Sequence, residues 1–264
     1  MTKAEIERLQ GLLNKVGGLL TTDGLIGRNT RRAVADARAL SGLPGGTEAD
    51  QALIDWLAAQ AEPSPDLPTE GVTFIANEEV GGRDFYEAQA TFPQWPGEQS
   101  GITIGVGYDL RFSADIFETD WGDKLPADVL AALRPHLGKL GNRAAAEALS
   151  GLRVPWTTAW RVFIGRSLPL QVVRTRGVYT AFANLPGLCR SVLVSLVFNR
   201  GTDLDDEPGS DRRLEMRTIR GLLQGGKVDQ VPDQLLAMRR LWPDSRGLRE
   251  RREREAALWR KGLA

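Results

Sequence analysis

Glu79 is the residue whose position best suits proton transfer. It stands just before Gly81-Gly82, a pair of residues that should end a helix over 72–79. The negative end of a helix dipole disfavours an ionised carboxylate, so a glutamate there can keep its proton near neutral pH. A general acid needs that property, and Glu79 is therefore a candidate acid.

A second group of candidates lies in SGITIGVGYDL (100–110), where β-branched residues alternate with glycines. This pattern predicts a short hairpin. Alternation places Thr103 and Asp109 on a small, polar face that can line a cleft. The opposite, apolar face should join the core and consists of Ile102, Ile104, Val106 and Tyr108. Glu79 and Asp109 would then provide one acid and one base.

Other catalytic groups are scarce in this chain. It has one cysteine, Cys189, and one histidine, His136, so no intrachain disulfide can form. A catalytic zinc site normally takes three protein ligands, which disfavours a zinc hydrolase, and we expect no metal and no cofactor. Cys189 is expected to be a small buried side chain, and His136 a partly exposed helix residue.

Composition excludes several broad classes of protein. The length of 264 residues suggests one or two domains. The 34 Lys and Arg residues balance the 34 Asp and Glu residues, so the chain has no basic footprint for nucleic acid. No apolar run approaches the ~20 residues of a membrane span, and we expect no stable membrane insertion. The N-terminal MTKAEIERLQ has no signal-type apolar stretch, which indicates synthesis in the cytoplasm.

Composition shifts predict a domain over 1–61, a linker over 62–70 and a larger domain over 71–264. The linker, EPSPDLPTE, is proline-rich and should be extended. Apolar residues at helical spacing predict a three-helix bundle in the first domain, with Asn29 or Thr30 capping the second helix and the third starting near Glu48. Its core positions are Ile6, Leu9, Leu12, Leu13, Ala33, Val34, Ala37, Leu53, Ile54 and Leu57.

Helical periodicity dominates the rest of the chain from Pro126 onward. SVLVSLVF (191–198) is apolar nearly all round and predicts a buried central helix that ends at Gly201. The fold class is therefore α+β, predominantly helical. The expected helices are 126–136, 142–149, 155–164, 168–182, 188–200, 214–224, 228–240 and 247–261.

Several motifs, taken in order, resemble those of phage-type lysozymes, muramidases that cut the glycan strands of peptidoglycan. The motifs are E-x6-Y (79–86), TIG-x-G (103–107), SLVFNRG (195–201) and GLRERREREAALWRKG (247–262). The run W-P-G-x-x-S-G-x-T-I-G-x-G-Y-D-L (95–110) is similar to the pesticin-like branch of that superfamily. The resemblance covers about 71–262 and implies a lysozyme-like domain with a small hairpin sheet.

The resemblance implies that Glu79 is the general acid and that Thr103 holds the attacking water, as in inverting members. The family's usual second carboxylate lies two residues after the tyrosine, inside the hairpin, where this chain has Ala88. In the pesticin-like pattern the aspartate follows the threonine by six residues, which gives Asp109 as the base.

Two further carboxylates, Glu87 and Glu98, remain alternatives to Asp109 as the base. Candidates for contact with substrate are Tyr86, Trp95, Glu98 and Asn199, although Tyr86 also suits the core. Arg251 and Arg252 suit either salt bridges inside the fold or a solvated helix face.

The segment LQGLLNKVGGLLTTDGLIGRNTRRAV (9–34) resembles the small three-helix peptidoglycan-binding domain. Asp23-Gly24 should bend the chain, and Gly27 should permit close approach. The resemblance implies binding of bacterial cell-wall peptidoglycan, and such a module raises the effective concentration of substrate for a catalytic partner.

Together these resemblances predict a modular muramidase that hydrolyses the β-1,4 bond between N-acetylmuramic acid and N-acetylglucosamine, with inversion. We expect a monomeric phage endolysin, made in the host cytoplasm and acting on the wall from the periplasm. Three alternatives stay open. They are a non-catalytic wall-binding or structural protein on a lysozyme scaffold, a secreted antibacterial toxin, and a lytic transglycosylase that uses one glutamate and no base.

Overall fold

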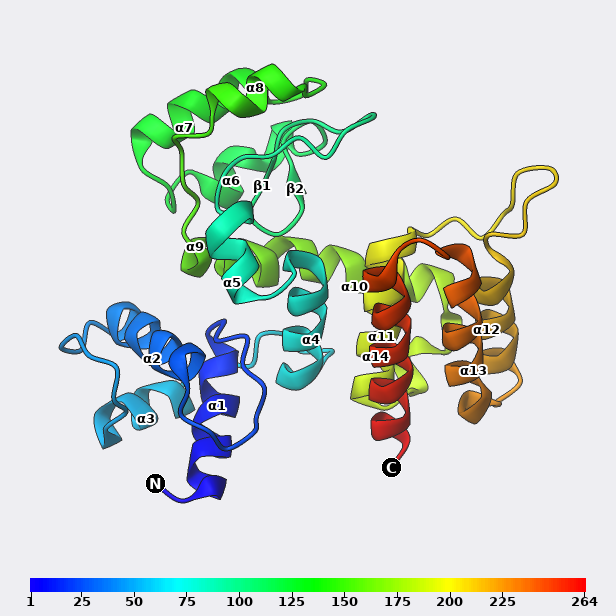
Figure 1. Ribbon diagram of the computed structural model, residues 1–264, viewed down its shortest axis with the longest axis horizontal. Helices are drawn as coiled ribbons and strands as arrows, with labels where there is room; N and C mark the ends of the chain where they lie inside the picture. The colour runs from blue at the N-terminus through cyan, green and yellow to red at the C-terminus, as the bar shows by residue number, and fades with distance from the viewer. The chain divides into compact units, whose positions relative to one another are not determined.

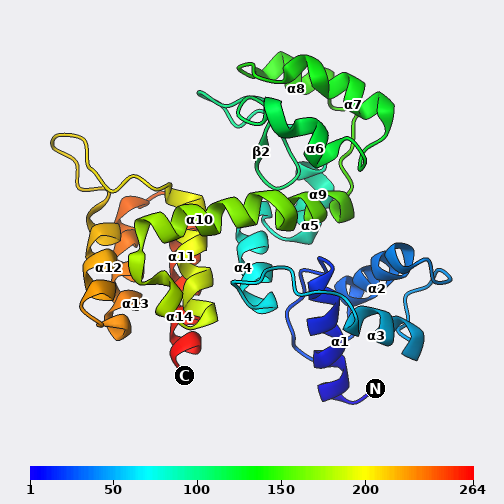
Figure 2. The ribbon, with the colours of Figure 1, turned by 180° about the vertical axis from the view of Figure 1, so that it is seen from behind.

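The computed structural model describes residues 1–264 and is mostly helical, with one two-stranded antiparallel sheet (Figures 1 and 2). This confirms the prediction of a mostly helical chain with one small hairpin. The chain forms two compact units, one of Met1–Pro63 with Glu79–Leu168 and the other of Ser64–Glu78 with Pro169–Ala264. Residues of the predicted larger domain therefore occur in both units. No helix is both long enough and apolar enough to cross a membrane.

Three helices at the N-terminus share one apolar core, as the periodicity predicts. They are α1 (Lys3–Lys15), α2 (Arg28–Ser41) and α3 (Gln51–Ala58). Core residues from all three helices are buried and in contact, namely Leu9, Leu13, Ala33, Val34, Ala37, Leu53 and Leu57, together with Leu20 from the loop after α1.

The predicted helix starts in this region were wrong in detail. Gly27, and not Asn29 or Thr30, is the N-cap of α2. Thr30 is buried and donates its hydroxyl hydrogen to the carbonyl of Leu25, so it closes the preceding loop. The third helix starts at Gln51 because Asp50 accepts a hydrogen bond from the backbone N–H of Leu53.

The predicted linker is packed and turned, and is not an extended tether. Pro63, Ser64 and Leu67 are buried. The Ser64 hydroxyl accepts hydrogen bonds from the backbone N–H groups of Asp66 and Leu67, which fixes a tight turn. Helix α4 (Thr69–Val80) already begins within the predicted linker.

The hairpin occupies the place that its sequence predicts. Strands β1 (Thr103–Ile104) and β2 (Tyr108–Asp109) pair antiparallel, and their apolar face is buried. Two helical stretches next to the hairpin escaped the sequence analysis, one over residues 83–90 and one over 114–121. The remaining elements of this unit are α5 (Arg83–Phe85), the π-helical η1 (Tyr86–Ala90), η2 (Ala114–Ile116), α6 (Phe117–Trp121), α7 (Ala127–Leu133), η3 (Arg134–His136), α8 (Arg143–Ala148), α9 (Trp156–Val162) and the π-helical η4 (Phe163–Ser167).

The C-terminal part of the chain is built around α11 (Gly187–Arg200), whose residues 191–197 are all buried. This confirms the predicted central helix, and Gly201 ends it with φ +76°. Helix α14 packs against both α11 and α13, and α13 also packs against α12 (Figures 1 and 2). The other elements here are α10 (Leu168–Val178), η5 (Thr180–Asn184), α12 (Leu214–Gln224), η6 (Val228–Gln230), α13 (Val231–Ala237), η7 (Met238–Leu241) and α14 (Arg246–Leu263).

Candidate active site and candidate binding pocket

Glu79 is the next-to-last residue of α4, where the sequence predicts it, and its side chain is half-buried. The helix cannot continue because Gly81 and Gly82 adopt φ +67° and +86°, a backbone conformation that favours glycine. The glycine pair therefore fixes Glu79 at the C-terminus of the helix.

Thr103 and Asp109 are directly opposite each other in the hairpin. Cross-strand partners of an antiparallel pair project to the same face, with Cβ atoms about 4.5–5.5 Å apart. Both side chains are half-buried. The structure thus brings together the two hairpin residues that the sequence analysis selected. Thr103 is also held on its other side by a two-way backbone bridge to Gln94.

The Asp109 carboxylate is engaged by the backbone of its own loop. Its oxygens accept from the N–H of Gly101, at 3.1 Å to Oδ1 and 3.0 Å to Oδ2, and from the N–H of Arg111, at 2.8 Å to Oδ1. A carboxylate has about four acceptor positions, so these bonds leave room for about one further donor, such as a water. Asp109 braces the loop and retains one position for chemistry.

The two alternative bases differ sharply from Asp109. Glu87 is bound by Arg83 at 2.7 Å, and Arg83 also pairs with Asp36 at 2.8 Å. Glu98 is exposed, at φ +50° in the loop that precedes the hairpin. Ala88, where the lysozyme pattern has its usual carboxylate, lies in the π-helical turn η1 and not inside the hairpin. That expectation about its place was wrong.

Tyr86 is a core residue, which is one of the two roles that the sequence analysis allows for it. It is 0% exposed, and its hydroxyl donates to the carbonyl of Val154 at 2.9 Å. Its ring packs edge-on against Trp156. Burial raises the pKa of the Tyr86 phenol well above its usual value. Tyr86 therefore ties η1 to the chain before α9.

Trp95 and Asn199, the other candidates for substrate contact, are both half-buried. Trp95 lies against Gly141, where an added Cβ would come within 2.6 Å of the indole ring. Asn199, on α11, accepts a hydrogen bond from Arg252 at 3.3 Å. The indole N–H of Trp95 is buried and has no hydrogen-bond acceptor in the protein, whereas the Asn199 side chain is already engaged by Arg252.

The C-terminal unit holds a buried network of charges around Glu255, which is 0% exposed. One Glu255 oxygen, Oε1, lies 3.3 Å from Arg251 and 2.9 Å from Arg252, and accepts from the Ser195 hydroxyl at 2.7 Å. Arg251 and Arg252 therefore form salt bridges inside the fold and are not a solvated face. Charges buried in this way must be paired, and the network joins α11 to α14.

Cys189 is the small buried side chain that the sequence predicts. Its thiol contacts the carbonyl of Trp259 at 3.6 Å, and burial raises the pKa of the thiol to about 11. The thiolate, which a cysteine nucleophile requires, is therefore scarce at neutral pH. His136 is half-buried in η3, and desolvation together with Lys139 lowers the pKa of its imidazole.

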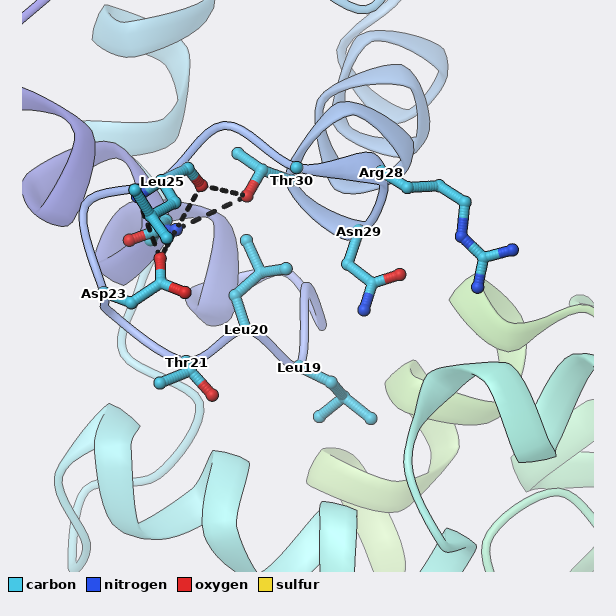
Figure 3. Close-up of a pocket in the computed structure, with 10 residues that line it drawn as sticks. Leu19, Leu20, Thr21, Asp23, Leu25, Arg28, Asn29 and Thr30 are labelled. Carbon is cyan, nitrogen blue, oxygen red and sulfur yellow. Dashed lines mark hydrogen bonds between the residues drawn. The ribbon is translucent and has the colours of Figure 1, made fainter.

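A second concave site lies in the three-helix region, in a cavity of about 350 Å³ beside the loop that joins α1 to α2 (Figure 3). Gln10, buried on α1, holds this loop through four hydrogen bonds. Its amide donates to Asp23 Oδ1 at 2.8 Å, to the carbonyl of Leu25 at 3.0 Å and to Thr30 at 3.4 Å, and its oxygen accepts from the N–H of Gly24 at 3.0 Å. Sequence analysis treated Gln10 only as a motif position and missed this role.

The polar groups at this cavity come mainly from exposed side chains. Thr21, Asp23 and Asn29 line it, and the Arg28 side chain extends away from them (Figure 3). Asp23 uses only Oδ1 in hydrogen bonds, because Gln10 and the N–H of Leu25 both donate to that atom. These bonds lower the pKa of Asp23, the Gln10 bond contributing most. The cavity therefore presents a carboxylate oxygen, an amide and a hydroxyl to a ligand.

No family model matches the chain, and a search of curated proteins finds no relative.

Proposed function

We propose that the chain is a modular muramidase that binds bacterial peptidoglycan and hydrolyses the β-1,4 bond between N-acetylmuramic acid and N-acetylglucosamine. The observation that carries this proposal is the pairing of Thr103 with Asp109 on the polar face of the hairpin. Glu79 adds a carboxyl at a helix C-terminus. These are the residue types that hydrolysis of a glycosidic bond needs, namely one protonated and one ionised carboxyl with a group that orients water.

In the proposed mechanism Glu79 protonates the oxygen of the leaving sugar. Asp109 uses its remaining acceptor position to take a proton from water, and the Thr103 hydroxyl orients that water. The two backbone N–H groups that donate to Asp109, from Gly101 and Arg111, keep its carboxylate fixed, which pre-organises the base. Inversion of the anomeric carbon is the expected outcome, since water attacks without a covalent intermediate.

The three-helix region is proposed to bind the wall through the cavity beside Asp23 and Asn29. We also propose a lysozyme-like arrangement of the hairpin and surrounding helices, and an endolysin that is made in the host cytoplasm and reaches the wall after release. A secreted toxin would use the same chemistry with another route of delivery.

Release of reducing sugar ends from purified peptidoglycan tests the catalytic proposal. Wild type should release ends, and Glu79→Gln should lower the rate by about 10²–10⁴-fold because the general acid is lost. Glu147→Gln, on exposed α8, is the matched control and should behave like wild type. Absence of release by wild type would contradict the enzymatic proposal and leave a wall-binding module.

A lytic transglycosylase is the second candidate, favoured by the engagement of the other carboxylates. Asp109 is braced by its loop and Glu87 is paired with Arg83. A transglycosylase needs one glutamate and no base. Mass spectrometry separates the two reactions, because the transglycosylase leaves anhydro product ends. In that case Asp109→Asn would stay active, whereas the muramidase proposal expects a loss of about 10²-fold or more.

A further inference from the structure

The N-terminal helices pack against the hairpin-bearing part of the same unit. The indole N–H of Trp156 donates to the carbonyl of Gly17 at 2.6 Å, and this bond is buried. Gly17 has φ +90°, and a Cβ there would come within 2.7 Å of the Trp160 ring. Only glycine fits this close contact. The ion pair of Arg83 with Asp36 adds a charged contact at 2.8 Å.

This contact leaves a groove with a volume of about 440 Å³, which we call the junction groove. Its chief lining residues are Lys15, Trp56 and Gln60 from the N-terminal helices and Thr157, Trp160 and Arg161 from α9. A volume of about 300–1,000 Å³ and a position between two modules are both typical of ligand sites. The groove exists only because the two parts of the unit pack together.

The lining combines aromatic surface with one unsatisfied polar group. Trp56 is half-buried, so part of its indole remains exposed. The indole N–H of Trp160 is buried and has no hydrogen-bond acceptor in the protein. A buried donor without a partner is costly, and such groups in native proteins need an explanation. A ligand or water with an acceptor atom would supply one.

The groove is also cationic on balance. Lys15 is paired with Glu62 at 2.8 Å, and Arg161 adds a second positive charge to the lining. Arg161 is exposed, and its guanidinium interacts electrostatically with Asp123. A guanidinium next to an indole suits a ligand that has both a flat apolar ring face and a carboxylate, because arginine binds carboxylates through two parallel hydrogen bonds.

We propose that the junction groove binds a carboxylate-bearing saccharide of the wall glycan, with a sugar ring on Trp56 and a lactyl or peptide carboxylate on Arg161. This site is separate from both the Glu79 region and the cavity beside Asp23, and the proposal rests on the proposed wall-degrading function. It would give the chain a further contact along the same glycan strand and so raise the affinity of the whole molecule for polymer.

Calorimetric titration of the full chain, in the Glu79→Gln background, tests the site with two soluble probes. One is a disaccharide–tetrapeptide fragment of peptidoglycan, which is anionic, and the other is chitotetraose, which is neutral. Arg161→Ala should weaken binding of the anionic fragment by tenfold or more and change binding of chitotetraose by less than twofold. Trp56→Leu should weaken both, and Arg143→Ala, an exposed arginine on α8, should weaken neither.

The outcome separates this site from the proposed function. If wild type releases reducing ends and Arg161→Ala binds the anionic fragment within twofold of its parent, the junction groove proposal is overturned and the muramidase proposal stands. If wild type releases no ends and binds neither probe, both proposals fall. Because Arg161 is exposed, its loss should leave folding intact. A melting temperature within about 2 °C of the parent, measured by circular dichroism, checks this.

Discussion

Two loops of this protein are each organised around an aspartate, yet they use it differently. In the loop after α1, Asp23 directs one oxygen to Gln10 and to the N–H of Leu25, and leaves the other without a hydrogen bond. In the hairpin, Asp109 uses both oxygens on the N–H groups of Gly101 and Arg111. The first loop is held mainly by a buried side chain from a helix, whereas the second is held by its own carboxylate.

The difference shows that an aspartate can either keep an oxygen available for a ligand or use both oxygens to hold its own loop. Where Gln10 supplies the structural bonds, the exposed carboxylate of Asp23 keeps an oxygen for a ligand. Where no such side chain is present, Asp109 must itself satisfy buried N–H groups, and its capacity for chemistry is limited to about one further donor. The proposed catalytic base is therefore also a structural residue, and tests of it must separate stability from activity.

The largest effect on stability is expected for Asp109→Ala. The substitution leaves the N–H groups of Gly101 and Arg111 without acceptors, and the free energy of unfolding should fall by about 3 kcal/mol. Asp109→Asn keeps an oxygen that can accept from both groups, so it should cost about 1 kcal/mol. Denaturant unfolding measures both variants. Asp115→Ala, which removes an exposed carboxylate nearby, is the control and should change stability by under about 0.5 kcal/mol.

A loss for Asp109→Ala no larger than that for Asp115→Ala would contradict the bracing role. The same series also tests catalysis, since Asp109→Asn separates the two roles. A folded but inactive Asp109→Asn variant would support Asp109 as the catalytic base. A folded and active variant would favour the transglycosylase reaction.

A smaller loss is expected for Gln10→Leu. Gln10 is 1% exposed, and leucine would leave the N–H of Gly24 without its acceptor and would remove one of the donors to the carbonyl of Leu25. The free energy of unfolding should fall by about 2 kcal/mol. Gln51→Leu, at an exposed position of α3, should have little effect. If the two variants unfold at the same denaturant concentration, the loop does not depend on Gln10, and the contrast between the two loops fails.

The smallest effect is a pH dependence at Asp23. Hydrogen bonds from Gln10 and from the N–H of Leu25 lower the pKa of Asp23 in the folded state. A lowered pKa means that this carboxylate stabilises the fold above its unfolded pKa of about 3.9, and that the contribution is lost as pH falls through the folded pKa. From about pH 5 to 8, which lies above that unfolded pKa of about 3.9, the full contribution of the carboxylate is present. In this range the melting temperature of Asp23→Asn should lie slightly below that of wild type.

The two melting temperatures should converge at more acidic pH, as thermal melts between about pH 7 and pH 2.5 would show. Asp55→Asn, exposed on α3, is the control for loss of one negative charge. A difference that persists unchanged at the acidic end would show that the lowered pKa does not contribute to stability.

Local sequence pattern predicted much of this fold. The apolar spacing of α1 to α3, the all-round apolar run of α11 and the alternation in the hairpin each depend on which face of an element avoids water, and that is written in the order of residues. Gly81-Gly82 likewise marks the end of α4, because no other residue pair tolerates positive φ so readily. Helices with weak amphipathic signals, such as α5 with η1, could not be found in this way.

The tertiary structure decided which polar residues are available. The sequence could not tell that Tyr86 is sealed in the core, that Glu87 is neutralised by Arg83, or that Arg251 and Arg252 meet at Glu255. Nor could it predict that Gln10 frees an oxygen of Asp23, or that Gly17 packs on Trp160 and so builds the junction groove. These outcomes depend on partners many residues apart, and hydrogen bonding and burial between distant residues exist only once the chain has folded.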